Sequence, residues 1–352
     1  MKKLFLAIVV LVALGAAVYL YSGRLMEAGA DRQAPAPGAT GVPADAPAAT
    51  GSPAVDASPR QRADALFWRE PAGGGNEVWR FGAGSAPERH AVQPLDSGWQ
   101  ARVFAPGGWG GDDLIVWRNR NVGELRIWRL ARDGAIAAFE VLPYSDNDWR
   151  IVAARDMDAD GDADLVWAGP KGNIAVWTLD NGKPADKQVV GTVREGWTLA
   201  QVADVDGDGR AELLWRVPAS GRMVLWTMNG TARAEQRELP GVSDDWTLIA
   251  VGQLDGAGGE DLLWRGATGT LAVWRGLSSA GAIIVQRPEQ AGWTFAGLAD
   301  SDGDGRAELL WRHQGDGRMG AWGVADDGKV LDVALPASPA GAEQVPVGFV
   351  AP

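Results

Sequence analysis

Between residues 64 and 352, short apolar runs alternate with clusters of turn-forming residues. The segments 211–217 (AELLWRV) and 221–228 (GRMVLWTM) are examples, and Gly, Asp, Asn and Pro fill the turns that separate such runs. Runs of this length that are rich in aliphatic and aromatic residues predict β-strands. No segment in this region has a helical pattern, and 48 glycines in 352 residues would oppose helices. The pattern predicts an all-β domain.

Tryptophans mark an internal repeat of about 48 residues. They fall into three columns at equivalent positions of successive units. The first column is Trp68, Trp117, Trp167, Trp215, Trp264 and Trp311; the second is Trp79, Trp128, Trp177, Trp226, Trp274 and Trp322; the third is Trp99, Trp149, Trp197, Trp246 and Trp293. Each unit holds four predicted strands. Four strands per unit at this period are typical of a β-propeller blade.

The repeat predicts one six-bladed β-propeller over residues 64–352. The first unit begins at Asp64 and lacks its leading strand, whereas the chain ends with an unassigned strand-like segment, 345–352 (VPVGFVAP). We expect this C-terminal strand to complete the N-terminal blade. Such closure of the ring would remove an open sheet edge.

The tryptophans allow two interpretations. Indole faces can stack on sugars, but a residue that recurs in the same strand of every blade is more typical of packing between blades. The tryptophans of the second and third strands are 10 or 11 residues apart across a tight turn. This spacing makes them cross-strand neighbours, so we favour core packing.

Three units carry the same carboxylate pattern between their first and second strands. Acids at positions 1, 3, 5 and 9 surround a glycine at position 6, and position 7 offers a backbone carbonyl. The residues are Asp156, Asp158, Asp160, Asp162 and Asp164 in the first loop; Asp204, Asp206, Asp208, Arg210 and Glu212 in the second; and Asp300, Asp302, Asp304, Arg306 and Glu308 in the third. Oxygen ligands in this number suit Ca²⁺. A single loop of this kind would be an ordinary solvated turn, but three equivalent copies favour calcium.

These loops are not EF-hands, because position 12 of each is a strand tryptophan and not a glutamate. Two other units have lost most of the pattern. The loop 253–261 keeps only Asp255 and Asp261, so we expect a weak or empty site. In the stretch 106–113 only Asp113 holds a ligand position, and Trp109 is expected to pack where the metal would sit.

The repeating unit, of the form GWxxxxxADxDGDGRAELLWR, resembles the FG-GAP or VCBS-type repeat of integrin-like β-propellers. The resemblance covers residues 64–352, with three strong and three degenerate units. It implies a propeller with calcium bound in its blades, of the kind found in exported adhesion, recognition and carbohydrate-related proteins. It does not imply one activity, and integrin-type propellers usually have seven blades.

The N-terminus predicts export. Residues 1–23 comprise Lys2, Lys3 and an uncharged apolar run from Leu4 to Tyr21, which is near the lower limit for a membrane span. We expect a signal anchor in a bacterial inner membrane, with the propeller on the periplasmic side. Secretion after cleavage of a signal peptide is the alternative. Residues 24–63 are rich in Ala, Pro and Gly and predict a disordered linker.

Composition excludes several functions. The chain has no cysteine and two histidines, so thiol chemistry and histidine-ligated metals are not expected; a net charge of −12 argues against a nucleic-acid partner. We expect a non-enzymatic binding or scaffold module for an envelope or extracellular glycan or protein. The alternative is a calcium-dependent polysaccharide lyase or hydrolase.

One candidate surface for such a ligand lies opposite the acidic loops. In a four-stranded blade, the connections from one blade to the next, such as 144–149 and 242–246, lie on that opposite face. An arginine follows the second-strand tryptophan in five units: Arg69, Arg118, Arg216, Arg265 and Arg312. These five would form a ring able to contact an anionic glycan or an acidic protein. We favour the alternative, in which each arginine pairs with an acid on a neighbouring blade.

Overall fold

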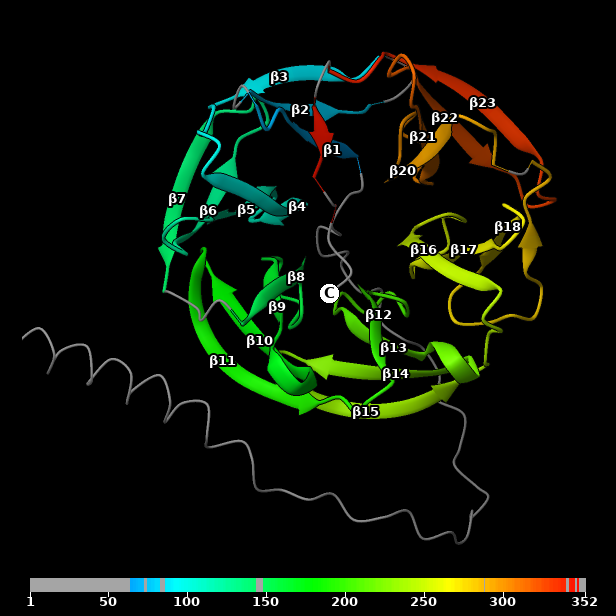
Figure 1. The fold of residues 1–352 in the computed structure, drawn as a ribbon, viewed down its shortest axis with the longest axis horizontal. Coiled ribbons are helices and arrows are strands. Elements are labelled where there is room, and N and C mark those ends of the chain that lie inside the picture. Colours follow the sequence, from blue (N-terminus) through cyan, green and yellow to red (C-terminus); the bar gives the residue numbers. More distant parts are fainter. Residues whose placement is uncertain are drawn as a thin grey trace, which may run out of the picture. The chain divides into compact units, whose positions relative to one another are not determined.

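The computed structural model describes residues 64–72, 75–82, 86–143, 148–287, 289–339, 342–345 and 347. Within these ranges the chain forms β-strands and two short 3₁₀ helices, η1 (Pro170–Gly172) and η2 (Pro218–Ser220). The strands build six four-stranded antiparallel sheets, which stand as blades around a common centre (Figure 1). The all-β prediction and the number of blades are confirmed.

In blades 2 to 6 the strands follow chain order from the centre of the ring outward, whereas in blade 1 the C-terminal strand is innermost (Figure 1). We number the blades along the chain. Blade 1 contains β24 (Glu343–Gln344), β1 (Ala65–Arg69), β2 (Asn76–Arg80) and β3 (Glu88–Val92); blade 2 contains β4 (Trp99–Trp109), β5 (Asp112–Asn119), β6 (Leu125–Leu130) and β7 (Ile136–Leu142); blade 3 contains β8 (Arg150–Arg155), β9 (Asp164–Ala168), β10 (Asn173–Asp180) and β11 (Lys183–Thr192).

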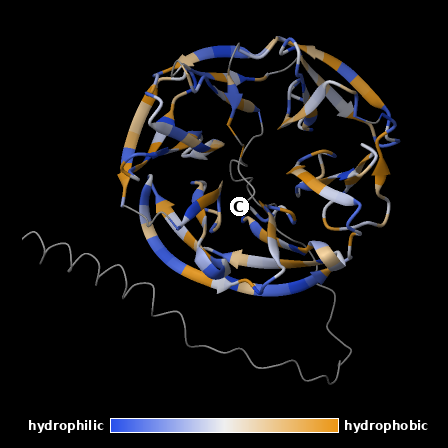
Figure 2. Ribbon diagram, viewed as in Figure 1, coloured by the Kyte–Doolittle hydropathy of each residue, from blue (hydrophilic) through white to orange (hydrophobic). Residues whose placement is uncertain are grey.

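The second half of the ring repeats this arrangement. Blade 4 contains β12 (Thr198–Ala203), β13 (Glu212–Val217), β14 (Arg222–Asn229) and β15 (Ala232–Leu239); blade 5 contains β16 (Trp246–Gly252), β17 (Asp261–Gly266), β18 (Leu271–Trp274) and β19 (Ile283–Ile284); blade 6 contains β20 (Trp293–Ala299), β21 (Glu308–His313), β22 (Met319–Val324) and β23 (Val330–Leu335). Hydrophilic and hydrophobic residues both occur along the outermost strands, which face solvent on one side (Figure 2).

The C-terminal segment closes the ring. Strand β24 pairs with β1 of the N-terminal blade, and the backbone N–H of Val345 donates to the carbonyl oxygen of Phe67 at 2.9 Å. Val347 then forms a parallel bridge with Phe104 of blade 2. The predicted closure is confirmed, although the ladder begins at Glu343, two residues before the segment that we expected. Residues 348–352 lie outside the described residues.

Six hydrophobic clusters form the core, one between each pair of neighbouring blades. Every blade contributes a tilted tryptophan pair from its second and third strands, with ring centroids 4.5 to 5.3 Å apart. The partners are diagonal in the ladder, because Leu66 and not Trp68 lies directly opposite Trp79. All six second-strand tryptophans are buried. Burial excludes sugar stacking for that column and supports core packing.

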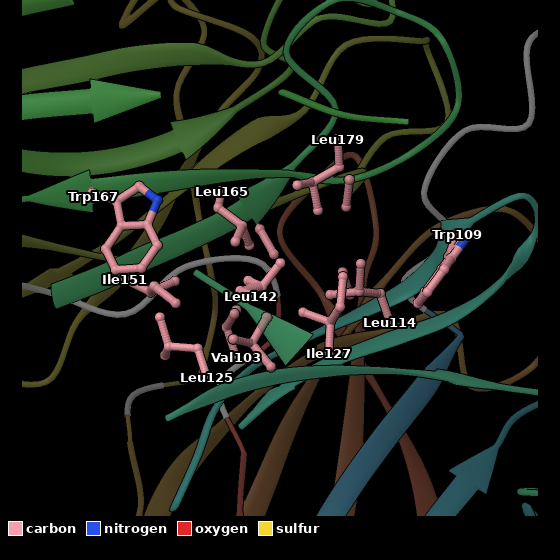
Figure 3. Packing of buried hydrophobic residues seen from close by; sticks show 14 of the residues in the cluster. Val103, Trp109, Leu114, Leu125, Ile127, Leu142, Ile151, Leu165, Trp167 and Leu179 are labelled. Carbon is pink, nitrogen blue, oxygen red and sulfur yellow. The ribbon is translucent and has the colours of Figure 1, made fainter. Parts of the chain in front are cut away.

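Trp109 ends the first strand of blade 2, where a tight turn replaces the acidic loop. The residue is 3% exposed and belongs to the cluster between blades 2 and 3, together with Leu114, Ile127 and Leu179 (Figure 3). It packs so closely against Gly182 in the turn between β10 and β11 that a Cβ at that glycine would lie 2.2 Å from the indole. Trp109 therefore fills the space between two blades.

The predicted anchor (1–23) and linker (24–63) lie outside the described residues. In the part of the chain that the structure describes, no helix is long and apolar enough to cross a membrane.

Candidate metal centres at one face of the propeller

The three acidic loops occupy equivalent places. They join β8 to β9, β12 to β13 and β20 to β21, where the innermost strand of a blade turns back into the second strand. The turns between third and fourth strands reach the same face, since Asn181 N–H donates to Asp162 Oδ2 at 2.9 Å and Gly230 N–H donates to the carbonyl oxygen of Met157 at 2.8 Å. We call this the loop face. The opposite face, where each inner strand begins, is the entry face.

The aspartate at position 1 shapes each loop. One carboxylate oxygen of Asp156 accepts the backbone N–H of Ala159 at 2.7 Å, and the other accepts that of Gly161 at 2.9 Å. Asp204 and Asp300 make the same two contacts in their loops. The glycine at position 6 adopts a positive φ of 87° to 92° in all three loops. A side chain would strain this backbone, as the predicted sharp turn requires.

Each loop brings three carboxylate oxygens to within 4.8 Å of one another. Positions 1, 3 and 9 converge in blades 3 and 4, whereas positions 1, 3 and 5 converge in blade 6. The groups are Asp156, Asp158 and Asp164; Asp204, Asp206 and Glu212; and Asp300, Asp302 and Asp304. The predicted sets of acids are therefore assembled in part, with one acid of each loop left outside.

The acids outside these groups have other partners. Asp160 accepts the N–H of Asp162 at 2.8 Å, and Asp208 forms an ion pair of 3.1 Å with Arg210. In blade 6, Glu308 accepts the N–H and the hydroxyl of Ser301 at 2.7 and 2.5 Å. A serine at position 2 thus draws the closing acid away from the other carboxylates.

The acid at position 9 is buried and fixes the loop to its blade. In blade 3, both oxygens of Asp164 accept backbone N–H groups, from Met157 and Leu179, each at 2.8 Å. In blade 4, Glu212 uses Oε2 in the same way, toward Val205 at 3.0 Å.

Two carboxylate oxygens in these groups, Glu212 Oε1 and Asp158 Oδ1, are buried and have no hydrogen-bond partner among the described residues. A buried unpaired carboxylate oxygen is costly. A hard cation bound between the converging oxygens would satisfy both, so the donor set fits Ca²⁺.

Burial also sets the proton affinity of these groups. Loss of hydration raises the pKa of Asp156 to about 6, and those of Asp164 and Glu212 to about 9. Neighbouring carboxylates raise these pKa values further, and backbone N–H donors oppose the shift. Burial likewise raises the pKa of Asp204 and Glu308. A cation would compete with protons at each loop.

Position 7 was predicted to provide a backbone carbonyl. The side chain of Arg210 turns back to Asp208, and that of Arg306 reaches Asp326 in the turn between β22 and β23 at 3.3 Å. Coordination by the carbonyl oxygens of Asp162, Arg210 and Arg306 stays a prediction.

The degenerate loop of blade 5 keeps the fold of the others and holds no carboxylate cluster among the described residues. Gln253 replaces the position-1 aspartate and accepts the N–H of Gly256 at 2.9 Å. Asp261 accepts the N–H groups of Leu254 and Gly276 at 3.0 and 2.8 Å. The expectation of a weak or empty site stays a prediction.

Asp113 in blade 2 has a structural role. It is 2% exposed, forms an ion pair of 2.5 Å with Arg80 of blade 1, and accepts the N–H of Gly107 at 3.0 Å. The carboxylate therefore joins two blades.

Sequence analysis missed Glu260, which stands at position 8, where the other loops have alanine. Its carboxylate forms an ion pair of 3.1 Å with Arg155 of blade 3 and accepts the N–H of Asp204 in blade 4 at 2.9 Å. Glu260 thus holds three blades together. The signal was present in the repeat, as a charged residue at a position otherwise occupied by alanine.

The five predicted ligand-binding arginines lie toward the entry face, where they hold the connections between blades. Arg216 donates to the carbonyl oxygens of Trp246, Ser243 and Val242 at 2.6, 2.8 and 3.3 Å. Arg69 donates to Asp96 and Trp99 carbonyls at 2.9 Å each.

Arg69 and Arg216 are 5% and 8% exposed, so neither presents its charge to a ligand. This corrects the predicted ring at two of its five positions. Arg118 donates to the Trp149 carbonyl and Arg312 to the Ser338 hydroxyl, and Arg265 pairs with an acid, Glu289, at 3.4 Å. A ligand-binding role for these three stays a prediction.

Comparisons with known proteins agree with the fold. The family model of the FG-GAP-like repeat matches residues 156–215, which include two of the acidic loops. None of the curated protein sequences matches the chain.

Three solved structures are similar at low identity. A periplasmic gluconolactonase of Pseudomonas aeruginosa is 13% identical, with a TM-score of 0.41 over 80% of this chain and 99% of that one. The Tc holotoxin pore of Photorhabdus luminescens is 15% identical, with a TM-score of 0.44 over 80% of this chain, which spans 17% of the toxin chain. KlHsv2 with one loop replaced by a Gly-Ser linker is 11% identical, with a TM-score of 0.42 over 78% of this chain and 95% of that one. The chain is thus a six-bladed β-propeller that carries the FG-GAP-like repeat.

Proposed function

We propose that this chain is an exported, membrane-tethered β-propeller that is stabilised by calcium and acts as a binding or scaffold module. The proposed calcium binding rests on one observation: Glu212 Oε1 is buried within a group of three converging carboxylates and has no hydrogen-bond partner among the described residues. Equivalent groups in blades 3 and 6 support it, because three copies in one place of the fold argue for a shared role.

The loops of blades 3, 4 and 6 would each hold one Ca²⁺ between the three carboxylates that converge there. Bound calcium would neutralise carboxylates that otherwise repel one another and would fix the loop against its blade. Since these acids are engaged by the backbone and by the proposed cation, they support a structural role for the loop face. The ligand surface is therefore proposed on the entry face.

Attachment to the membrane rests on the sequence of residues 1–63. The apolar run after Lys2 and Lys3 would anchor the chain in a bacterial inner membrane, and the Ala/Pro/Gly-rich linker would hold the propeller on the periplasmic side. Release into the medium after signal cleavage is the alternative, and fractionation of cells that produce the full chain distinguishes the two.

The function is tested by a binding screen. The full chain is presented to a glycan array and to envelope protein fractions, in calcium and again in EDTA. Saturable binding of one glycan or one protein, weakened when EDTA destabilises the domain, would support the module. Cleavage of an envelope polysaccharide would instead favour the calcium-dependent lyase or hydrolase, and unchanged folding in EDTA would refute the calcium role.

A further inference from the structure

Four arginines gather where blades 2 and 3 meet near the entry face. Arg102 lies in the innermost strand β4, Arg118 and Arg120 lie at the end of β5 and in the turn after it, and Arg150 begins β8. Two contacts bring these residues to one corner. Arg118 donates to the carbonyl oxygen of Trp149, the neighbour of Arg150, at 3.0 Å, and the backbone N–H of Arg120 donates to the carbonyl oxygen of Gly98, just before β4, at 2.7 Å. Burial lowers the pKa of the Arg102 guanidinium, and the like charges of the other three arginines lower it further.

The repeat does not require these charges. Arg102 is the third residue after the first-strand tryptophan and lies at the β-bulge of β4. The equivalent residues of the other blades are apolar and pack into the clusters toward the next blade: Val152, Ala200, Ile249 and Ala296. Arg150 follows Trp149, at a position where blades 4, 5 and 6 have threonine. Both arginines therefore depart from the residues that the fold uses elsewhere.

No hydrogen bond or ion pair within the described residues satisfies the guanidinium groups of Arg102, Arg120 or Arg150. Arg118 differs, because it donates to the Trp149 carbonyl at 3.0 Å. Arg102 is half-buried, whereas Arg120 and Arg150 are exposed. A half-buried cation with no acceptor among the described residues, placed beside three more cations, is destabilising unless something compensates for it.

The nearby carboxylates have other roles. Asp96 accepts the N–H of Gly98 at 2.8 Å, and Glu124 pairs with Arg126 at 2.5 Å. The chain carries a net charge of −12, so general basicity does not explain four clustered arginines.

We propose that this corner, formed by Arg102, Arg118, Arg120 and Arg150, binds a multiply charged oxyanion. Guanidinium groups donate in a planar fork that matches carboxylate, phosphate and sulfate oxygens. Arg120 and Arg150 are exposed to solvent, and Arg102 is half-buried in the innermost strand of the same blade as Arg120. The inference rests on the proposed binding function and names the ligand chemistry of that module.

The test measures binding of three probes to the full chain: inorganic phosphate, citrate and polygalacturonate. Because each probe also binds calcium, cell and syringe are buffered to the same low free calcium concentration and a titration without protein is subtracted. Titration calorimetry should show saturable binding to at least one of them. Binding of phosphate or citrate alone would identify a free small anion, and binding of polygalacturonate alone would identify an acidic polymer. Arg102→Val with Arg150→Thr, the residues of other blades, should weaken binding by at least about tenfold. The matched control is Arg237→Gln on the exposed outer strand β15, which should bind as the natural chain does.

A second readout does not depend on affinity. Because Arg102→Val removes an uncompensated charge, it should raise or preserve the Tm without anion, and the anion should no longer raise it. Absence of saturable binding by all three probes, or equal weakening in the Arg237 control, would overturn the anion site. If a glycan or protein found in the screen still bound the double variant normally, the anion site would fail while the module stood. If the anion bound but the screen gave no other ligand, the site would stand and the broader function would fail.

Discussion

The backbone N–H of Ala211 in blade 4 donates to the carbonyl oxygen of Asp156 in blade 3 at 2.8 Å. The same bond recurs at position 8 of each loop, from Ala163 to Gly108, from Glu260 to Asp204 and from Ala307 to Gln253, at 2.7, 2.8 and 2.6 Å. The loops of blades 2 to 6 are therefore hydrogen-bonded in series. A cation that fixes one loop would also brace the loop of the next blade.

Calcium removal should therefore destabilise the whole ring. We expect EDTA to lower the Tm of the full chain in calorimetry, and calcium to restore it. At a concentration a hundred times its Kd, each bound ion adds about 2.7 kcal/mol. Asp255→Asn in the degenerate loop is the control and should leave the calcium dependence unchanged. An identical Tm in calcium and in EDTA would contradict the structural role.

Glu212→Gln should remove one calcium site. The amide keeps an acceptor for Val205 N–H but lacks the charge that a cation requires. Native mass spectrometry should show one calcium fewer than in the natural chain. Without calcium at pH 8 the variant should be more stable than the natural chain, because Glu212 must take up a proton to fold there and a glutamine does not. Glu235→Gln on β15 is the control and should retain every calcium ion. If Glu212→Gln also retained every ion, Glu212 would not be a calcium ligand.

The metal-free domain should lose stability as the pH rises. Burial raises the folded-state pKa of Asp156 to about 6 and those of Asp164 and Glu212 to about 9, above their unfolded values near 4. A raised pKa contributes stability that is complete below the unfolded value and is lost as the pH rises through the folded value. In EDTA, the urea midpoint should therefore be higher at pH 5 than at pH 8.

Calcium should reverse this trend, because it binds the deprotonated acids. The comparison of both pH values with and without calcium separates the loops from other titrating groups. A metal-free midpoint that rises from pH 5 to pH 8 would show that these acids do not control stability.

The ring of six blades could be predicted from the sequence because the sequence repeats once per blade. The tryptophan columns set the number of blades, and the missing first strand before Asp64 indicated closure by the C-terminus. Individual contacts were predicted less well. Nothing in the repeat shows that Ser301 binds Glu308, or that Asp113 faces Arg80 of another blade. Such pairings depend on the distances between blades, which periodicity does not provide.

The contacts of the arginines were not predictable from the repeat either. An arginine after five of the six second-strand tryptophans was compatible with a surface ring, yet the carbonyl groups that accept from Arg216 belong to the connection into blade 5. By contrast, Glu260 and Arg102 could have been found from the sequence. Each departs from the residue type that the other blades place at its position.

Backbone strain in the first loop should be relieved by one substitution. Ala159 adopts a φ of 67°, whereas the equivalent residues Gly207 and Gly303 have φ values of 78° and 80°. A left-handed conformation costs a non-glycine residue about 1 to 2 kcal/mol, partly offset by the flexibility of glycine in the unfolded chain. We expect Ala159→Gly to raise the free energy of unfolding by up to about 1 kcal/mol.

A glycine-to-alanine change at position 6 of another loop tests the same argument. Gly305 has a φ of 87° and no atom within 4 Å of a Cβ, so Gly305→Ala adds strain without a clash. It should lower the free energy of unfolding by about 1 kcal/mol in urea titrations. A loss of stability in Ala159→Gly would show that strain does not limit this loop.

Arg216→Ala should lower the free energy of unfolding far more than Arg265→Ala does. Arg216 is buried and donates to three backbone carbonyls, which Arg216→Ala would leave without their charged donor. We expect a loss of about 2 to 3 kcal/mol in the free energy of unfolding. Arg265 is 43% exposed and pairs with Glu289 at 3.4 Å, so Arg265→Ala should cost under about 1 kcal/mol. Equal losses, measured by urea denaturation in calcium, would mean that the carbonyl contacts of Arg216 contribute little beyond a surface ion pair.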